Sequence, residues 1–158
     1  MKYLNITSPD VNNGSGCRVT LWLSGCKKHC LGCQNPSTWN FNQGKEVTKE
    51  TIEELAKILE KPYIKGLTLS GGNPTDNSEE DLVWLLQEIK TRFPEKDIWL
   101  YSGDTLETLK ETKLKVLELI DVLVDGEFRL GERDTSLAFR GSRNQKIWKK
   151  DDKGEFYV

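Results

Sequence analysis

Four short segments have the hydrophobic pattern of buried β-strands. Residues 19–23 alternate apolar side chains with other residues, which predicts a strand that ends near Ser24-Gly25. Residues 66–70 and 97–102 predict two further strands, and residues 122–124 predict a short fourth one. The last segment is continuously apolar, which is typical of a strand in a parallel sheet that is covered on both faces.

Three segments between these strands have the spacing of amphipathic helices. The first follows Thr48 and ends before Pro62, and the second follows Ser78, a predicted N-cap, and ends before Pro94. The third extends from Thr105 to about Leu117. The apolar stripes of the first two helices consist of Ile52, Leu55 and Leu59, and of Leu82, Leu85, Leu86 and Ile89.

Strands that alternate with helices favour an α/β fold with a mostly parallel sheet. The 158 residues of the chain are too few for a closed eight-stranded barrel, which needs about 250. We therefore expect one domain, residues 1–158, with an open sheet or a partial (β/α) barrel. Residues 129–158 are polar and interrupted by glycine, and the pattern assigns them no element.

Charge and hydropathy narrow the range of functions. The 25 acidic and 23 basic residues give a formal charge of −2, and the basic residues are spread along the chain, so we expect no nucleic-acid partner. No apolar run approaches the roughly 20 residues of a membrane-spanning helix, and the first residues lack the apolar core of a signal peptide. We therefore expect a cytoplasmic location and no membrane partner; thiols in that compartment stay reduced.

Three cysteines are concentrated in the loop after the first predicted strand. Cys26, Cys30 and Cys33 have the spacing C-x3-C-x2-C, so three thiolates can converge on one centre without help from distant segments. Iron–sulfur clusters are held by cysteine thiolates, usually four. Three local ligands on a four-iron cluster would leave one iron without a protein ligand, and an open coordination position is where chemistry can occur.

Two other interpretations of the cysteine loop stay open. A zinc site could use His29 or Cys17 as its fourth ligand, and two of the thiols could be redox-active. His29 shares its loop with Lys27 and Lys28, and we expect all three side chains to be solvated. Cys17 lies at the start of the first predicted strand, where a free, half-buried thiol is the expected state.

The other three predicted strands also end in loops of unusual composition. These loops contain Gly71-Gly72-Asn73-Pro74, Ser102-Gly103-Asp104 and Asp125-Gly126-Glu127. In parallel α/β folds such loops share the carboxyl edge of the sheet, where active sites lie. Each loop alone could be an ordinary turn, but together with the cysteines they predict a single site at that edge.

The cysteine spacing after a first strand resembles the signature of the radical S-adenosylmethionine (SAM) superfamily. The resemblance implies that Cys26, Cys30 and Cys33 bind a [4Fe–4S] cluster and that SAM occupies the fourth iron. Reductive cleavage of SAM then gives methionine and a 5′-deoxyadenosyl radical. The implied SAM contacts are Gly71, Gly72 and Asn73 at the methionine amino group, Ser102 and Gly103 near the ribose, and Asp125 near the adenine. The sequence departs from many members at Gly32, where they have an aromatic residue.

Further segments resemble one family of this superfamily, the activating proteins of anaerobic ribonucleoside-triphosphate reductases. The segments are Gly25-Cys26, residues 30–39, residues 66–72, residues 121–126 and residues 140–145. The resemblance implies an oxidoreductase whose radical takes a hydrogen from a glycine of the reductase, with an external electron donor such as a flavodoxin-type protein. Residues Arg140 to Gln145 combine guanidinium and amide groups that could bind a backbone loop or a carboxylate.

Several alternatives to this function come from different classes. The chain could activate another glycyl-radical enzyme, such as pyruvate formate-lyase, or act on a small molecule. It could also be a non-catalytic zinc or electron-transfer module. The short segment of about 25 residues before the cysteine motif favours the reductase as partner, by resemblance to the compact activating proteins.

Overall fold

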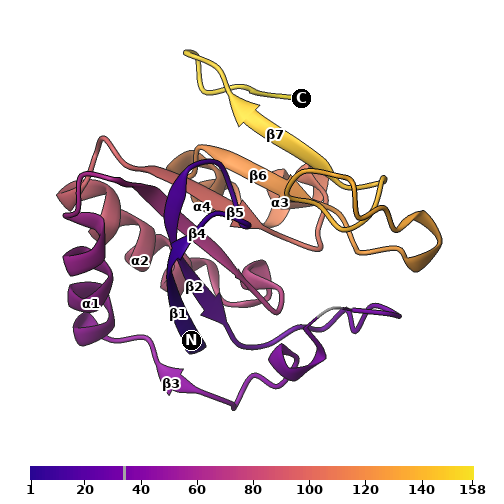
Figure 1. Cartoon of the computed structure of the whole chain (residues 1–158), viewed down its shortest axis with the longest axis horizontal. Coiled ribbons are helices and arrows are strands. Elements are labelled where there is room, and N and C mark those ends of the chain that lie inside the picture. Colours follow the sequence, from indigo (N-terminus) through magenta and orange to yellow (C-terminus); the bar gives the residue numbers. More distant parts are fainter. Residues whose placement is uncertain (34) are drawn as a thin grey trace.

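The chain forms a single eight-stranded sheet, here described in a computed structural model (Figure 1). The structure describes residues 1–33 and 35–158; Gln34, which belongs to one of the resembling segments, lies outside the described residues. The sheet order is β3-β1-β2-β4-β5-β6-β7-β8. The strands are β1 (Lys2–Asp10), β2 (Cys17–Leu23), β3 (Lys45–Glu46), β4 (Ile64–Gly71), β5 (Asp97–Tyr101), β6 (Val122–Asp125), β7 (Lys146–Lys150) and β8 (Phe156–Tyr157).

The four central strands are those that the hydrophobic pattern predicts, and they are parallel. β2 pairs with β4, β4 with β5 and β5 with β6. Leu21 lies opposite Leu69, Leu69 opposite Leu100, and Leu100 opposite Leu123. The predicted α/β class with an open sheet is therefore confirmed, and the carboxyl ends of these strands lie at one edge.

Both flanks of the sheet are antiparallel, so the expectation of a mostly parallel sheet holds only for its centre. β1 pairs antiparallel with β2 and β3, while β7 pairs antiparallel with β6 and β8. The sequence pattern missed β1 because its register shifts twice, between Tyr3 and Asn5 and between Thr7 and Asp10. Such irregularities break the alternation from which strands are predicted.

The helices cover one face of the sheet, and the alternation along the strands explains why. Leu21, Leu69 and Leu100 are fully buried in the core cluster that includes the helices. Thr20 and Thr68 are their neighbours in sequence, so they point to the opposite face. That face carries both polar side chains and a second hydrophobic cluster of Trp99, Val122 and Val124, and the helices leave it uncovered. The helices are α1 (Lys49–Leu59), α2 (Glu79–Arg92), α3 (Leu106–Thr112) and α4 (Leu114–Leu119) (Figure 1).

The first two predicted helices are confirmed, and the third is wrong in one respect. The Ser78 hydroxyl accepts the Asp81 N–H at 3.2 Å, as expected of an N-cap. The helix predicted from Thr105 to about Leu117 is two helices, since Lys113 leaves the helical conformation with φ −140° and ψ 38°. Across the described chain, none of the helices combines the length and the apolar character that a bilayer span demands.

Candidate functional site

A cavity of about 680 Å³ at the carboxyl ends of the central strands collects most of the predicted site residues. The loops after β2, β4, β5 and β6 all contribute to its wall. This arrangement follows from the parallel pairing, which places the four loops at the same edge. The predicted residues that line the cavity are Cys26, Cys30, Cys33, Gly71, Gly72, Asn73, Ser102 and Gly103.

Asp125 is the predicted site residue that does not line this cavity. Its buried carboxylate accepts the Leu106 N–H at 2.8 Å and so satisfies a donor in the first turn of α3. Asp125 lines a second hollow of about 470 Å³ instead. Its neighbour Gly126 borders both spaces.

The base of the cysteine loop is fixed by backbone hydrogen bonds to two other segments. Gly25 donates its N–H to the Thr38 carbonyl at 2.6 Å, and Cys26 donates to the Trp39 carbonyl at 3.1 Å. The Gly25 carbonyl accepts the Asn73 N–H at 2.8 Å. The loop therefore leaves the sheet in a defined direction, in contact with the Gly71-Gly72-Asn73 loop.

The three thiols share one cavity but differ in exposure. Cys26 is buried, whereas Cys30 and Cys33 are partly exposed, and none forms a disulfide. Burial raises the pKa of the Cys30 thiol, and the charges of Glu127, Cys26 and Cys33 add to this rise against a hydrogen bond from Phe128. A raised pKa lowers the fraction of free thiolate at neutral pH. A bound metal would instead keep the sulfur deprotonated.

The donor set fits an iron–sulfur cluster. The Asn35 N–H donates to Cys33 Sγ at 3.4 Å, a hydrogen bond of the kind that tunes cluster ligands. Cys26, Cys30 and Cys33 all line the same cavity, so their sulfurs face a shared space. Three cysteine thiolates are ligands of the type that iron–sulfur clusters use.

Of the two residues considered as a fourth zinc ligand, one lies far from the cysteine loop and the other stacks on a tryptophan. Cys17 is half-buried against the core at the opposite end of β2, roughly 20 Å from the cysteine loop at about 3.3 Å per residue. The exposed His29 ring stacks on Trp39, with centroids 4.4 Å apart and planes 10° from parallel.

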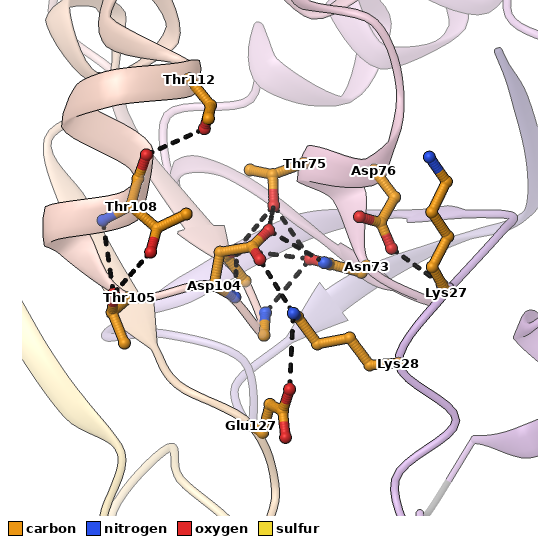
Figure 2. Close-up of polar contacts among 12 residues, drawn as sticks. Lys27, Lys28, Asn73, Thr75, Asp76, Asp104, Thr105, Thr108, Thr112 and Glu127 are labelled. Atoms are coloured by element: carbon orange, nitrogen blue, oxygen red, sulfur yellow. Dashed lines mark hydrogen bonds and ion pairs between the residues drawn. The ribbon is translucent and has the colours of Figure 1, made fainter.

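Lys28 forms two ion pairs, so the expectation that its side chain is solvated is wrong. Its Nζ lies 2.9 Å from Asp104 Oδ1 and 3.4 Å from Glu127 Oε1 (Figure 2). Burial opposes the charge of Lys28, but the two carboxylates outweigh it and raise the pKa. Burial likewise opposes the charge of Asp104, yet hydrogen bonds from Lys28, Thr75 and Asn73 lower its pKa. Lys27 is exposed, as expected.

Residues Arg140 to Gln145 use their polar groups on their own backbone and on the loop after β6. Gln145 Oε1 accepts the N–H groups of Gly141 at 2.8 Å and Ser142 at 3.1 Å, and its Nε2 donates to the Gly126 carbonyl at 3.0 Å. Arg140 Nη1 donates to the Gln145 carbonyl at 3.1 Å. The segment is thus a clasp between itself and the loop after β6, and Arg140 is its charged member that lines the cavity.

An aromatic wall of the cavity was not predicted from the sequence. Trp22 and Tyr101 lie at the alternate strand positions that point away from the helices, and both line the cavity. That period-two placement is the signal that could have found them. Phe128 and Phe139 complete this wall from a segment with no regular pattern. At Gly32 the neighbouring Leu130 side chain occupies the space that an aromatic residue would need.

Comparison with known proteins bears on the cofactor and on the family of the chain. Residues 12–148 match a family described as a 4Fe-4S single cluster domain, which supports an iron–sulfur cluster in the chain. Three relatives are each named anaerobic ribonucleoside-triphosphate reductase-activating protein. The one from Enterobacteria phage T4 is 44% identical, over 96% of both chains. Those from Vibrio cholerae and Escherichia coli K12 are 43% and 41% identical, over 93% of this chain and 97% of theirs.

Proposed function

The chain belongs to the family of anaerobic ribonucleoside-triphosphate reductase-activating proteins, and from this premise we propose that it activates such a reductase by cleaving SAM. The radical formed would take a hydrogen atom from a glycine of the reductase and leave a glycyl radical there. One observation carries the proposal: the cysteine loop and the Gly71-Gly72-Asn73 loop meet in one cavity. In this proposal residues 1–158 are one radical SAM domain, and the open sheet is its partial barrel.

Cys26, Cys30 and Cys33 would hold the cluster and leave one iron for SAM. When bound, the cluster supplies the electron that breaks a carbon–sulfur bond of SAM, which yields methionine and a 5′-deoxyadenosyl radical. The chain contributes a buried ligand at Cys26 and a hydrogen bond to Cys33 Sγ. Both features affect the potential of the cluster, because burial and N–H···S contacts set the cost of adding an electron.

The Gly71-Gly72-Asn73 loop is suited to bind the positively charged methionine amino group. The Gly72 N–H donates to the Leu23 carbonyl at 2.9 Å, and Asn73 Oδ1 accepts the Gly103 N–H at 3.1 Å, so the loop is held in place. The Gly72 carbonyl accepts no hydrogen bond from the described residues, which leaves it for an ammonium donor. A side chain at Gly72 would overlap the Gly25 carbonyl.

The proposal is tested with protein purified without oxygen. We expect about four iron and four sulfide ions per chain. Addition of a reductant and SAM should yield methionine and 5′-deoxyadenosine. Mixing with the reductase should add a glycine-centred doublet in the electron paramagnetic resonance spectrum, only when reductant and SAM are both present. A colourless protein with one zinc, or a cluster whose spectrum ignores SAM, would contradict the proposal.

The identity of the protein substrate needs its own control. The names of the relatives favour the reductase over pyruvate formate-lyase as partner. Offering each candidate enzyme separately, at equal concentration, should give the glycine doublet with the reductase alone. A doublet with pyruvate formate-lyase alone would keep the SAM chemistry and reject the proposed partner.

A further inference from the structure

Lys28 connects three loops at the rim of the cavity (Figure 2). It belongs to the cysteine loop, its nearer partner Asp104 to the loop after β5, and Glu127 to the loop after β6. Its side chain is 22% exposed, so the charge is largely withdrawn from water. The Lys28 stem also fills the space in which Gly103 would carry a side chain.

Asp104 is held from a second side, which extends the connection to the loop after β4. Lys28 binds Oδ1 of Asp104, whereas Oδ2 accepts hydrogen bonds from Thr75 Oγ1 at 2.9 Å and Asn73 Nδ2 at 3.2 Å. A carboxylate with partners on both oxygens has little freedom to move. The chain of contacts therefore joins the cysteine loop to Asn73 through two side chains (Figure 2).

The same ion pairs stand between the two hollows at this edge of the sheet. The cavity with the cysteines and the hollow of about 470 Å³ are both lined by Lys28 and Glu127. Gly103 and Gly126 also border both. Removal of the Lys28 ammonium would therefore remove both ion pairs from the boundary that the two spaces share.

We propose that Lys28 is a positioning residue that ties the cysteine loop to Asp104 and Glu127. Through this tie it sets the placement of the cluster ligands relative to the Gly71-Gly72-Asn73 loop and closes the cluster cavity toward the second hollow. Its neighbour Lys27 is exposed and forms no ion pair with any described residue. The inference deepens the proposed function and, for its SAM readout, rests on it.

The test compares Lys28→Met with Lys27→Met in cluster-loaded protein purified without oxygen. Methionine keeps an apolar stem but removes the charge, so the loop should open more often. We expect a chelator to extract iron from Lys28→Met about tenfold faster, without SAM present. The SAM concentration for half-maximal cleavage, measured per intact cluster, should also rise about tenfold. Lys28→Arg should restore most of both properties, and Lys27→Met should match the unmodified chain.

The two readouts separate failure of this inference from failure of the proposed function. Iron extraction needs no SAM. If the unmodified chain holds its iron but cleaves no SAM, the proposed function is rejected, and the extraction rates still test the ion pairs of Lys28. Equal extraction rates for Lys28→Met and Lys27→Met would overturn the inference. A lower unfolding midpoint for Lys28→Met, together with an unchanged SAM concentration for half-maximal cleavage, would also overturn the inference. If Lys28→Met does not fold, Glu127→Gln tests the same tie from the other partner, with the same expected directions.

Discussion

At the scale of single residues, the four cysteines separate into three that line the cavity and one that does not. Replacing Cys26, Cys30 or Cys33 by alanine should leave at least about tenfold less iron per chain, because even outer-shell changes weaken metal sites by that factor. Cys17→Ala should keep the cluster, since Cys17 packs against the core at the far end of β2. Iron content, sulfide content and visible absorption measure the cluster in the three ligand variants and in Cys17→Ala. Loss of the cluster in Cys17→Ala would show the ligand assignment to be wrong.

Asp10 is a second residue whose surroundings predict a measurable effect. Burial disfavours its charge, but the hydrogen bonds from Asn12 N–H, Asn13 Nδ2 and Thr20 Oγ1, each 2.8 Å long, outweigh it and lower the pKa below the ordinary 3.8. A lowered folded-state pKa contributes stability that is present above about 3.8 and is lost as pH falls through the folded value. Asp10→Asn should therefore cost about 1–3 kcal/mol at neutral pH.

Urea unfolding across pH separates this effect from general acid sensitivity. The unmodified chain should lose stability more steeply than Asp10→Asn as pH falls below about 3.8, because asparagine has no proton to take up. Asp152→Asn, at an exposed position, serves as the matched control and should follow the unmodified chain. Parallel curves for Asp10→Asn and the unmodified chain would contradict the role given to the carboxylate.

At the scale of elements, the hydrophobic periodicity predicts the helices and strands that bury a regular apolar stripe, and it misses those that do not. The central strands and helices α1 and α2 each present such a stripe, so they were predicted. The break at Lys113 was not, because Leu109 and Val116 remain buried on either side of it and continue the apolar pattern. β7 has only Ile147 and Trp148 as apolar residues. Its place in the sheet depends on pairing with β6, which no local pattern encodes.

At the scale of the whole molecule, the meeting of four loops at one edge could be predicted, whereas the contacts among them could not. Parallel strands place their carboxyl ends together whatever the side chains are, so the cysteine motif and the composition of the loops after the strands were enough to predict that these loops meet. The ion pairs of Lys28 with Asp104 and Glu127 join residues far apart in sequence. Their formation depends on loop conformations, and charged residues in loops are solvated in most proteins.

The clasp of residues 140–145 joins the segment over the cavity to the loop after β6, and Gln145 supplies three of its hydrogen bonds. Gln145→Ala removes all three, so residues 127–145 should separate from the cavity more often. Trypsin cleaves after lysine and arginine, and its cuts at Arg133 and Arg143, identified by the masses of the fragments, should be about tenfold faster at native temperatures. The unfolding midpoint should change little, because the core under the helices is not touched. Gln145→Glu keeps the acceptor oxygen, so its cleavage rate should lie between the rates of the unmodified chain and of Gln145→Ala.

Gln87→Ala is the control for this last prediction, since Gln87 is exposed on α2, away from the clasp. Its cleavage rate should equal that of the unmodified chain. Cleavage that follows global unfolding would instead scale with the loss of stability in every variant. Equal cleavage of Gln145→Ala and Gln87→Ala would show that the segment is held by other contacts, such as the Tyr101 hydroxyl donating to the Phe139 carbonyl at 2.8 Å. A Tyr101→Phe variant would then be the one to open the cavity.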